Sequence, residues 1–540
     1  MRTNIWVVLV LLASVTLLYA PFLWNPIIFD DLPFFMLDDA GGQPISNYRF
    51  SLLELRSLPY ATLAWTKEWF GLDMIGFRFG NLLLHAAVVL ALYFFLSRLF
   101  STVLGSGNDS RLSSRSAAFF SALIFALHPV AIYAAGYLIQ RTILMATLFS
   151  LLAMFAYLHG SVRNKPAWSW GSVLFYYLAV FSKEHAIMLP GLLLALTVLL
   201  HEDWWTRVKK HWGIWCAFVG VALFVAVIQK GLLGSVYELN APYMLQGIDG
   251  ELSYPLSVLT QSWLFFKYVG LWLYPNAVWM SVDMREPFAQ SLLSLYLLAL
   301  VLFLAWGAGA AWLLFKRGWT GLLGFALLFP WMLFFTEFSV VRIQESFVLY
   351  RSYLWMPGLV MVIALLFMKM QRKLAMVALG LICAMLVPVS LDRLNTFSHP
   401  LLLWDDAAKL VEGKPYLPGM ERIYFNRGLA LSKTKLKQES ISSYSTAIRM
   451  KPSFSYAYNN RGAVLFEIRR YEEALRDFEA TIALNPTYPN AHEGRAMVYE
   501  VFGNQEVAQE GYYKSCALGK RSCTKLSEPM KRKLREELGR

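Results

Sequence analysis

Apolar runs of about twenty residues recur from the start of the chain to about residue 391 and then stop. Each run is long enough to cross a hydrocarbon layer roughly 30 Å thick. Only 16% of the residues are charged, whereas a soluble domain normally carries roughly a quarter. Four cysteines in 540 residues are too few for a disulfide framework. We therefore predict a polytopic membrane protein, and we exclude a soluble enzyme, a disordered protein and a disulfide-stapled secreted module.

The predicted fold is all-α, with eleven membrane spans in an inner-membrane domain of residues 1–391. Short loops rich in Lys and Arg stay on the cytoplasmic side of a membrane, and one set of spans puts every basic cluster on that side. Those spans are 5–24, 79–97, 117–136, 142–159, 167–182, 186–201, 212–229, 290–315, 319–337, 351–368 and 374–391. Segment 256–274 carries Lys267 in its middle, which makes it a poor span, so we expect an interfacial or re-entrant helix. We expect the first apolar run to remain as an uncleaved span. The N-terminus is then cytoplasmic and the C-terminus is periplasmic.

After a linker at 392–418, the composition turns polar and a period of 34 residues begins. Asn426-Arg427-Gly428 recurs as Asn460-Arg461-Gly462 and as Gly494-Arg495-Ala496, and Tyr444, Phe478 and Tyr512 follow at the same interval. This period, with small residues where helices touch and an aromatic in the second helix, is typical of tetratricopeptide repeats. A generic helical hairpin is the alternative. We predict three repeats within 419–524, at about 421–454, 455–488 and 489–522, and a charged cap helix at 525–540. Such arrays hold peptides or partner proteins on a concave surface.

Cys516 and Cys523 lie seven residues apart at the end of the last repeat. If that domain is in an oxidising periplasm, a disulfide between them would pin the end of the array. Two unrelated thiols are the alternative.

Two pairs of carboxylates follow the first span, Asp30-Asp31 and Asp38-Asp39. Carboxylates at a membrane surface are costly unless they are hydrated or used. The plain interpretation is that they mark a solvated loop. We expect His128, beside Pro129, to be a helix-kink residue with a satisfied imidazole.

Further charged residues fall on the same predicted side as Asp31. Cations gathered at the level of lipid headgroups suit a phosphate-bearing lipid substrate, although each alone could be a snorkelling anchor. The candidate phosphate-binding cations are Arg141, Lys183, Arg342 and Arg351. Additional candidates on this side are Glu184, His185, Asp283 and Glu345.

Motifs in order along nearly the whole chain resemble the transmembrane-and-tetratricopeptide O-mannosyltransferases and their bacterial relatives. The motifs are Phe29-Asp30-Asp31, Arg78–Leu90, His128-Pro129-Val130, Gln140-Arg141, Ser182-Lys183-Glu184, Tyr274-Pro275, Ser281-Val282-Asp283, Tyr350–Pro357 and Trp404-Asp405-Asp406. The chain departs from the family at Ile143, where an acidic residue is usual.

The resemblance implies a GT-C-type, inverting glycosyltransferase. It would move a sugar from a polyprenyl-phosphate donor to a protein Ser or Thr hydroxyl at the outer face of the membrane. A first-loop carboxylate would take the hydroxyl proton, with Asp31 slightly favoured as base and Asp30 positioning the acceptor. The four cations would stabilise the leaving phosphate. We expect no cofactor and no metal, and we expect the repeats to dock the acceptor protein.

Three other functions remain open at this point. An oligosaccharide ligase would use a lipid-diphosphate donor and a long outward loop rich in Arg and His. A non-enzymatic protein would use the spans only to anchor a repeat scaffold for envelope or pilus assembly. A transporter would carry polar groups near the middle of the membrane.

Overall fold

The computed structural model describes residues 5–31, 35, 48–105, 112–228, 250–343, 346–519 and 521–538. Within these ranges every regular element is a helix, apart from one isolated antiparallel bridge between Met284 and Phe347. The all-α prediction is therefore confirmed. The chain divides into two compact units, Met1–His399 and Pro400–Arg540.

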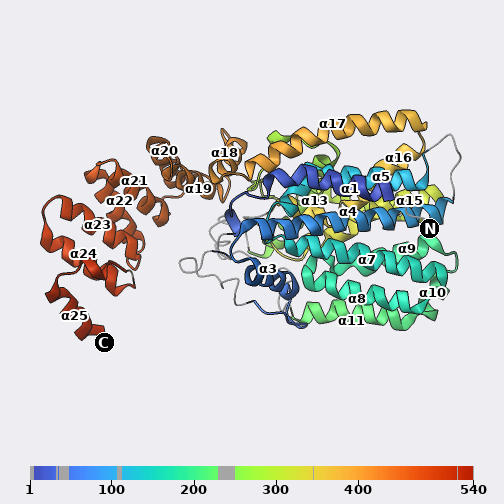
Figure 1. Cartoon of the computed structure of the whole chain (residues 1–540), viewed down its shortest axis with the longest axis horizontal. Coiled ribbons are helices and arrows are strands. Elements are labelled where there is room, and N and C mark those ends of the chain that lie inside the picture. Colours follow the sequence, from blue (N-terminus) through green and yellow to red (C-terminus); the bar gives the residue numbers. More distant parts are fainter. Residues whose placement is uncertain are drawn as a thin grey trace. The chain divides into compact units, whose positions relative to one another are not determined.

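The first unit is built from long apolar helices that run side by side (Figure 1). They are α1 (Ile5–Tyr19), α4 (Met74–Leu104), α5 (Ser114–Leu127), α6 (Pro129–Ala135), α7 (Arg141–Arg163), α8 (Pro166–Ser182), α9 (Leu189–Leu200), α11 (Trp212–Ile228), α13 (Ser253–Leu273), α14 (Leu295–Phe315), α15 (Gly318–Phe334), α16 (Pro357–Met368) and α17 (Arg372–Thr396). Two further helices of this unit are α3 (Ser57–Phe70) and α10 (Trp204–Lys210).

Several of these helices are suited to a membrane. In the described part of the chain, six helices are long and apolar enough to span a bilayer, or up to eight if each of two bent pairs counts as one span. The outer faces of these helices are apolar: Leu295 and Leu298 on α14 are 78% and 55% exposed, and Leu381 on α17 is 68% exposed. Large exposed apolar faces are unfavourable in water and are normal against lipid. The helices are thus compatible with a membrane protein, and the count of eleven crossings stays a prediction.

Helix α13 covers the segment that we expected to be interfacial or re-entrant. It has 21 residues and is not among the span candidates. The mid-helix Lys267 forms an ion pair with Glu286, which compensates its charge. One face of α13 is buried in the unit through Leu264, Tyr268 and Trp272.

A sharp bend at His128 separates α5 from α6, at 65°. Its Nδ1 accepts a hydrogen bond from the backbone N–H of Val130, and its Nε2 lies 3.1 Å from the carbonyl oxygen of Trp272. The imidazole ring of His128 stacks on the indole ring of Trp272, with the ring centroids 4.1 Å apart. The prediction of a kink residue with a satisfied imidazole is confirmed.

The second unit consists of helical hairpins, and most of the predicted linker at 392–418 is also helical. The linker residues form the end of α17 and the whole of α18 (Pro400–Val411). The hairpins are α19 (Met420–Ser432) with α20 (Lys437–Met450), α21 (Ser455–Glu467) with α22 (Tyr471–Leu484), and α23 (Pro489–Val501) with α24 (Gln505–Ala517). A terminal helix, α25 (Glu528–Leu538), lies within the predicted cap.

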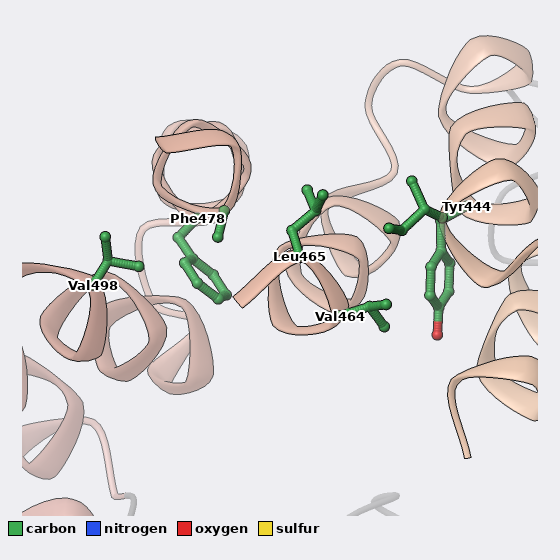
Figure 2. Packing of buried hydrophobic residues seen from close by; sticks show 7 residues of the cluster. Tyr444, Val464, Leu465, Phe478 and Val498 are labelled. Atoms are coloured by element: carbon green, nitrogen blue, oxygen red, sulfur yellow. The ribbon is translucent and has the colours of Figure 1, made fainter. Parts of the chain in front are cut away.

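The rings of Tyr444 and Phe478 lie in the core of these hairpins among aliphatic side chains such as Val464, Leu465 and Val498 (Figure 2). A Cβ on Gly428 would lie 2.8 Å from the ring of Tyr444, and one on Gly494 would lie 2.4 Å from the ring of Phe478. Phe478 also approaches Gly462 of its own hairpin, where the corresponding distance is 3.2 Å. The small residues of the 34-residue period are therefore the points where neighbouring helices meet the rings.

A disulfide joins Cys516, in the last turn of α24, to Cys523 in the short helix η9 (Arg521–Lys525). It closes the chain after the third hairpin, and both cysteines belong to the apolar cluster that Tyr512 and Leu526 share.

Candidate functional site

The carboxylate of Asp31 holds the turn between α6 and α7. It ends the short helix η2 (Phe29–Asp31) and is fully buried. Its two oxygens accept hydrogen bonds from the backbone N–H groups of Leu138 and Ile139, at 3.0 and 2.8 Å. Burial raises the pKa of Asp31 to about 6, although these N–H donors and the Arg78 guanidinium lower it. Asp31 thus fixes the backbone just before α7.

Arg141, the first residue of α7, does not join the other predicted phosphate-binding cations in a cluster. Its guanidinium donates to Asn81 Oδ1 at 2.8 Å, to the Phe77 carbonyl at 2.9 Å, and to the hydroxyls of Thr62 and Thr66 at 3.3 and 3.2 Å. All four acceptors are neutral and belong to α3 and α4. Arg141 is buried, and it therefore joins three helices instead of facing an open anion site.

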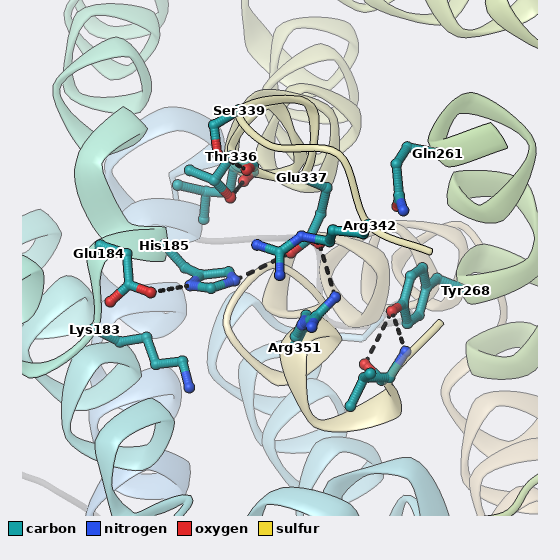
Figure 3. Close-up of polar contacts among 12 residues, drawn as sticks. Lys183, Glu184, His185, Gln261, Tyr268, Thr336, Glu337, Ser339, Arg342 and Arg351 are labelled. Carbon is teal, nitrogen blue, oxygen red and sulfur yellow. Dashed lines mark hydrogen bonds and ion pairs between the residues drawn. The ribbon is translucent and has the colours of Figure 1, made fainter. Parts of the chain in front are cut away.

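Three other predicted residues meet around a carboxylate that the sequence analysis did not single out, Glu337 (Figure 3). Glu337 is fully buried in the short helix η7 (Phe335–Phe338), at the end of α15. One oxygen lies 3.2 Å from Arg342 and 3.2 Å from Arg351, and Arg351 donates a hydrogen bond to it. The other oxygen lies 3.1 Å from Nε2 of His185. One carboxylate thus gathers two arginines and a histidine from three separate segments.

Helix α13 positions the segment that carries Arg351. The hydroxyl of Tyr268 accepts from the backbone N–H of Val348 and donates to its carbonyl, both at 2.9 Å. The indole N–H of Trp272 donates to Ser352 at 2.9 Å. Ser352 lies next to Arg351 in the short helix η8 (Leu349–Tyr353), so these contacts fix where the Arg351 guanidinium can reach.

Glu184 extends the cluster toward α3. Both of its oxygens contact the guanidinium of Arg56, the residue that precedes α3. Burial alone would raise the pKa of Glu184, but the charges of Arg56, His185 and Lys183 hold it well below its usual range. Arg56 adopts a left-handed backbone conformation with φ of 61°. The bidentate pair with Glu184 therefore fastens the start of α3 to the α8–α9 turn.

Lys183 is the exception to this pairing. It is buried at the C-terminal end of α8. Its ammonium lies 3.4 Å from Gln140 Oε1, 3.5 Å from the Thr142 hydroxyl and 5.0 Å from the centroid of the Tyr350 ring. No carboxylate of the described residues lies within ion-pair distance of it. Burial first, and then the charges of nearby arginines, lower the pKa of Lys183 to about 7 against the attraction of Glu184. A buried cation held only by neutral groups is suited to receive an anion.

The Asp31 turn and the Lys183 cluster are neighbours through one short segment. Asp31 contacts Leu138 and Ile139, while Lys183 contacts Gln140 and Thr142. Because one residue spans at most about 3.6 Å, the carboxylate and the ammonium cannot be more than about 16 Å apart. Among the described residues, the cluster contains more cations than carboxylates: Arg56, Lys183, Arg342 and Arg351 against Glu184 and Glu337.

The remaining predicted site residues fall outside this cluster or outside the described residues. Asp283 is buried and paired with Arg285 at 2.6 Å, next to the bridge between Met284 and Phe347. The side chain of Asp30, together with Asp38, Asp39 and Glu345, lies outside the described part of the chain. In the described part, no group of three or more His, Cys, Asp or Glu side chains is arranged to hold a metal ion. The expectation that no metal is needed stays a prediction.

Sequence reasoning missed Glu337 and Arg56, and only one of them had a detectable signal. Glu337 is the last residue of a predicted span, and an ionisable residue at the end of an apolar run is a functional candidate by default. Arg56 lies in an aromatic-rich stretch with no distinctive spacing, so only the fold brings it to Glu184.

Comparisons with known proteins identify the repeats. Two family models, both described as tetratricopeptide repeat, match residues 421–454 and 455–488. No curated protein matches the chain significantly. Among solved structures, a chain of the "Crystal structure of APC/C hetero-tetramer Cut9-Hcn1" is similar over 89% of this chain and 89% of that chain, at 13% identity and a TM-score of 0.21. A TM-score of that size carries no argument about fold or function.

Proposed function

We propose that this protein is an integral membrane glycosyltransferase that moves a sugar from a polyprenyl-phosphate donor to a protein Ser or Thr hydroxyl. The observation that carries the proposal is the buried cationic cluster around Lys183, Arg342 and Arg351. Lys183 lies in a buried position with only neutral contacts at 3.4 and 3.5 Å, which is costly unless an anion occupies the site during function. A lipid-linked phosphate supplies that anion.

The proposed reaction balances as a single displacement. The acceptor hydroxyl oxygen attacks the anomeric carbon of the sugar, and the bond from that carbon to the phosphate oxygen breaks. The bonding pair leaves with the lipid phosphate, whose charge the ammonium of Lys183 and the arginines would stabilise. Attack from the side opposite the phosphate inverts the anomeric centre. The hydroxyl proton passes to a carboxylate of the first loop.

The contacts of Asp31 favour a positioning role for it over the role of base that we slightly preferred. Asp31 is fully buried and both of its oxygens already accept backbone N–H groups, so an acceptor hydroxyl could hydrogen-bond to it only by displacing those bonds. Asp30, which precedes it, is then the better candidate for the base. In this assignment Asp31 sets the position of residues 138–142, and through them of the groups that contact Lys183.

The repeats supply the contact with the acceptor protein. Tetratricopeptide repeats commonly bind proteins or peptides, and family models for this repeat match two of the three hairpins. In the proposal they raise the local concentration of the acceptor. Deleting residues 419–540 should weaken modification of the protein acceptor more than hydrolysis of the lipid donor. An equal loss of both reactions would argue for a folding role of the repeats instead.

The test of the transferase proposal is the Lys183→Met variant, assayed for sugar transfer from a polyprenyl-phosphate sugar. Because Lys183 has no acidic partner among the described residues, its replacement leaves no buried carboxylate unpaired and should not unfold the protein. Lys369→Met is the matched control. That lysine lies over the Trp319 ring at 3.5 Å, just after α16, a helix of 12 residues or about 18 Å that begins near the cluster.

We expect Lys183→Met to lose transfer while Lys369→Met retains it, with both proteins present at wild-type abundance. Normal transfer by Lys183→Met would refute the assignment. Activity of the wild type with a lipid-diphosphate oligosaccharide, and none with a monophosphate donor, would favour the ligase alternative. No transfer with either donor would favour the membrane-anchored scaffold.

A further inference from the structure

A second cationic site lies at the other end of α8 from Lys183. A cavity of about 240 Å³ opens between the end of α7, the start of α8 and the helices α9, α10 and α11. Its lining includes Tyr157, Ser161, Lys165, Arg207, Lys210 and His211. Neither the sequence motifs nor the proposed transfer reaction uses this cavity.

Close packing and hydrogen bonds give the cavity a defined wall. A Cβ on Gly160 would lie 2.6 Å from the hydroxyl of Ser169, so the end of α7 and the start of α8 are in direct contact. The hydroxyl of Tyr157 lies 2.7 Å from that of Thr197 on α9. The hydroxyl of Ser161 lies 2.7 Å from Nε2 of His201. These contacts join three helices around one polar cavity.

The charge of the cavity is positive. None of its described lining residues is acidic. Arg207 donates to Asp203 at 3.1 Å and is partly compensated, whereas Lys165 and Lys210 have no carboxylate within ion-pair distance among the described residues. Burial, followed by the charges of Lys210 and Arg207, lowers the pKa of His211. An anion is the ligand that would relieve this repulsion.

The surroundings of the cavity are those of a membrane interface. Trp168, Trp170, Trp205 and Trp212 are 41%, 51%, 54% and 68% exposed near it along the chain. Exposed tryptophans of this kind gather where lipid headgroups meet the acyl chains. The 17 residues of α8 separate the cavity from Lys183 by about 25 Å, which is close to the roughly 30 Å of a hydrocarbon core. The two cationic sites are therefore spaced to reach opposite leaflets.

We propose that this cavity binds the phosphate of an anionic lipid headgroup in the cytoplasmic leaflet. Basic pockets between membrane helices on that side bind such headgroups through Lys and Arg. The two uncompensated lysines offer donors for phosphate oxygens. A free phosphoester shares this chemistry and is the other source of the same anion. The site does not depend on the transferase proposal.

The test compares two double variants of the full-length protein. Lys165→Ala/Lys210→Ala removes the two uncompensated cations of the cavity. Arg163→Ala/Lys209→Ala removes the same charge from the same two segments, but neither residue lines the cavity, and Lys209 lies over the ring of Trp205. Native mass spectrometry of detergent-solubilised protein, titrated with phosphatidylglycerol or with phosphatidylcholine, reports lipid retention. A parallel titration with sn-glycerol 3-phosphate tests the free phosphoester.

We expect phosphatidylglycerol to bind the wild type in preference to phosphatidylcholine. The cavity variant should bind it roughly thirtyfold more weakly, since each Lys or Arg near a membrane surface contributes about 1 kcal/mol toward anionic lipid and two are removed. The control variant should retain it. Loss of glycerol phosphate binding alone would overturn the lipid as the source and leave the phosphate site. Equal losses in both double variants, or none in either, would overturn the site itself.

Discussion

Replacing Asp31 with Asn tests whether Asp31 positions the backbone while Asp30 acts as the base. Asp31 accepts two backbone N–H groups in a fully buried position. An Asn side chain has one acceptor oxygen, and its NH₂ group would face the second N–H donor. A buried donor left without an acceptor costs about 1–3 kcal/mol. The neutral carboxyl group does not have this defect, because both of its oxygens can still accept.

The size of the effect should depend on pH in a definite direction. The pKa of Asp31 is raised from 3.8 to about 6. A raised carboxyl pKa means that its contribution to stability is full below about pH 4 and is lost as pH rises through 6. Asn does not titrate, so the stability difference between wild type and Asp31→Asn should be largest below about pH 4, remain measurable at pH 5 and shrink by pH 7.5.

Thermal unfolding in detergent, followed by tryptophan fluorescence, measures this difference. We expect Asp31→Asn to lower Tm by roughly 2–5 °C at pH 5, because about 1 kcal/mol shifts Tm by roughly 2–4 °C in domains of 150–250 residues and by less in larger ones. Asp73→Asn is the control: Asp73 caps α4 with a single bond to the Ile75 N–H, and Asn caps equally well. Asp30→Asn should lose transfer with an unchanged Tm. A Tm gap that is absent at pH 5, or that widens toward pH 7.5, would refute this account.

Three further predictions concern the cluster and the repeats. Burial and neighbouring arginines lower the pKa of Lys183 to about 7, so the KM for a phosphate-bearing donor should rise as pH increases through 7. Lys183→Arg should flatten that rise, because an arginine stays charged. A steep pH profile of KM in the Arg variant would contradict this prediction. Gly494→Ala should destabilise the repeats by up to about 2 kcal/mol in urea unfolding, because overpacking typically costs 1–3 kcal/mol against a helix-propensity gain of about 1 kcal/mol. Gly462→Ala, with its looser contact, should be near neutral. Equal effects of the two substitutions would show that the rings move freely. Replacing both Cys516 and Cys523 with Ser should cost roughly 2 kcal/mol of repeat stability, and addition of a reductant to the wild type should reproduce the loss.

The sequence predicted the elements of this protein better than the contacts between them. The 34-residue period located the hairpins because helix length and ring spacing are local properties, and the ring of Tyr444 indeed meets Gly428. The predicted linker was less accurate, since the helix α18 has no apolar run long enough to stand out. His128 was predictable because a proline follows it directly.

The candidate site shows the limit of such reasoning. A common side of the membrane suggested that Lys183, Arg342 and Arg351 would meet, and all three lie around Glu184 and Glu337. The same argument grouped Arg141 with them, but Arg141 donates to neutral oxygens of α3 and α4. Sidedness fixes a residue's depth along the membrane normal and leaves its position within the membrane plane undetermined. Only packing between helices supplies that second coordinate.

The left-handed backbone of Arg56 affects how easily the start of α3 can move away from Glu184. An arginine in that conformation is strained by about 1–2 kcal/mol relative to ordinary backbone, and its bidentate contact with Glu184 holds it there. This one ion pair therefore keeps the backbone before the first turn of α3 in a strained conformation. If a ligand binds the Arg56 guanidinium and breaks its ion pair with Glu184, the backbone strain at Arg56 is released. That release offsets part of the cost of breaking the pair, so the start of α3 separates from Glu184 more easily than the strength of the pair alone implies.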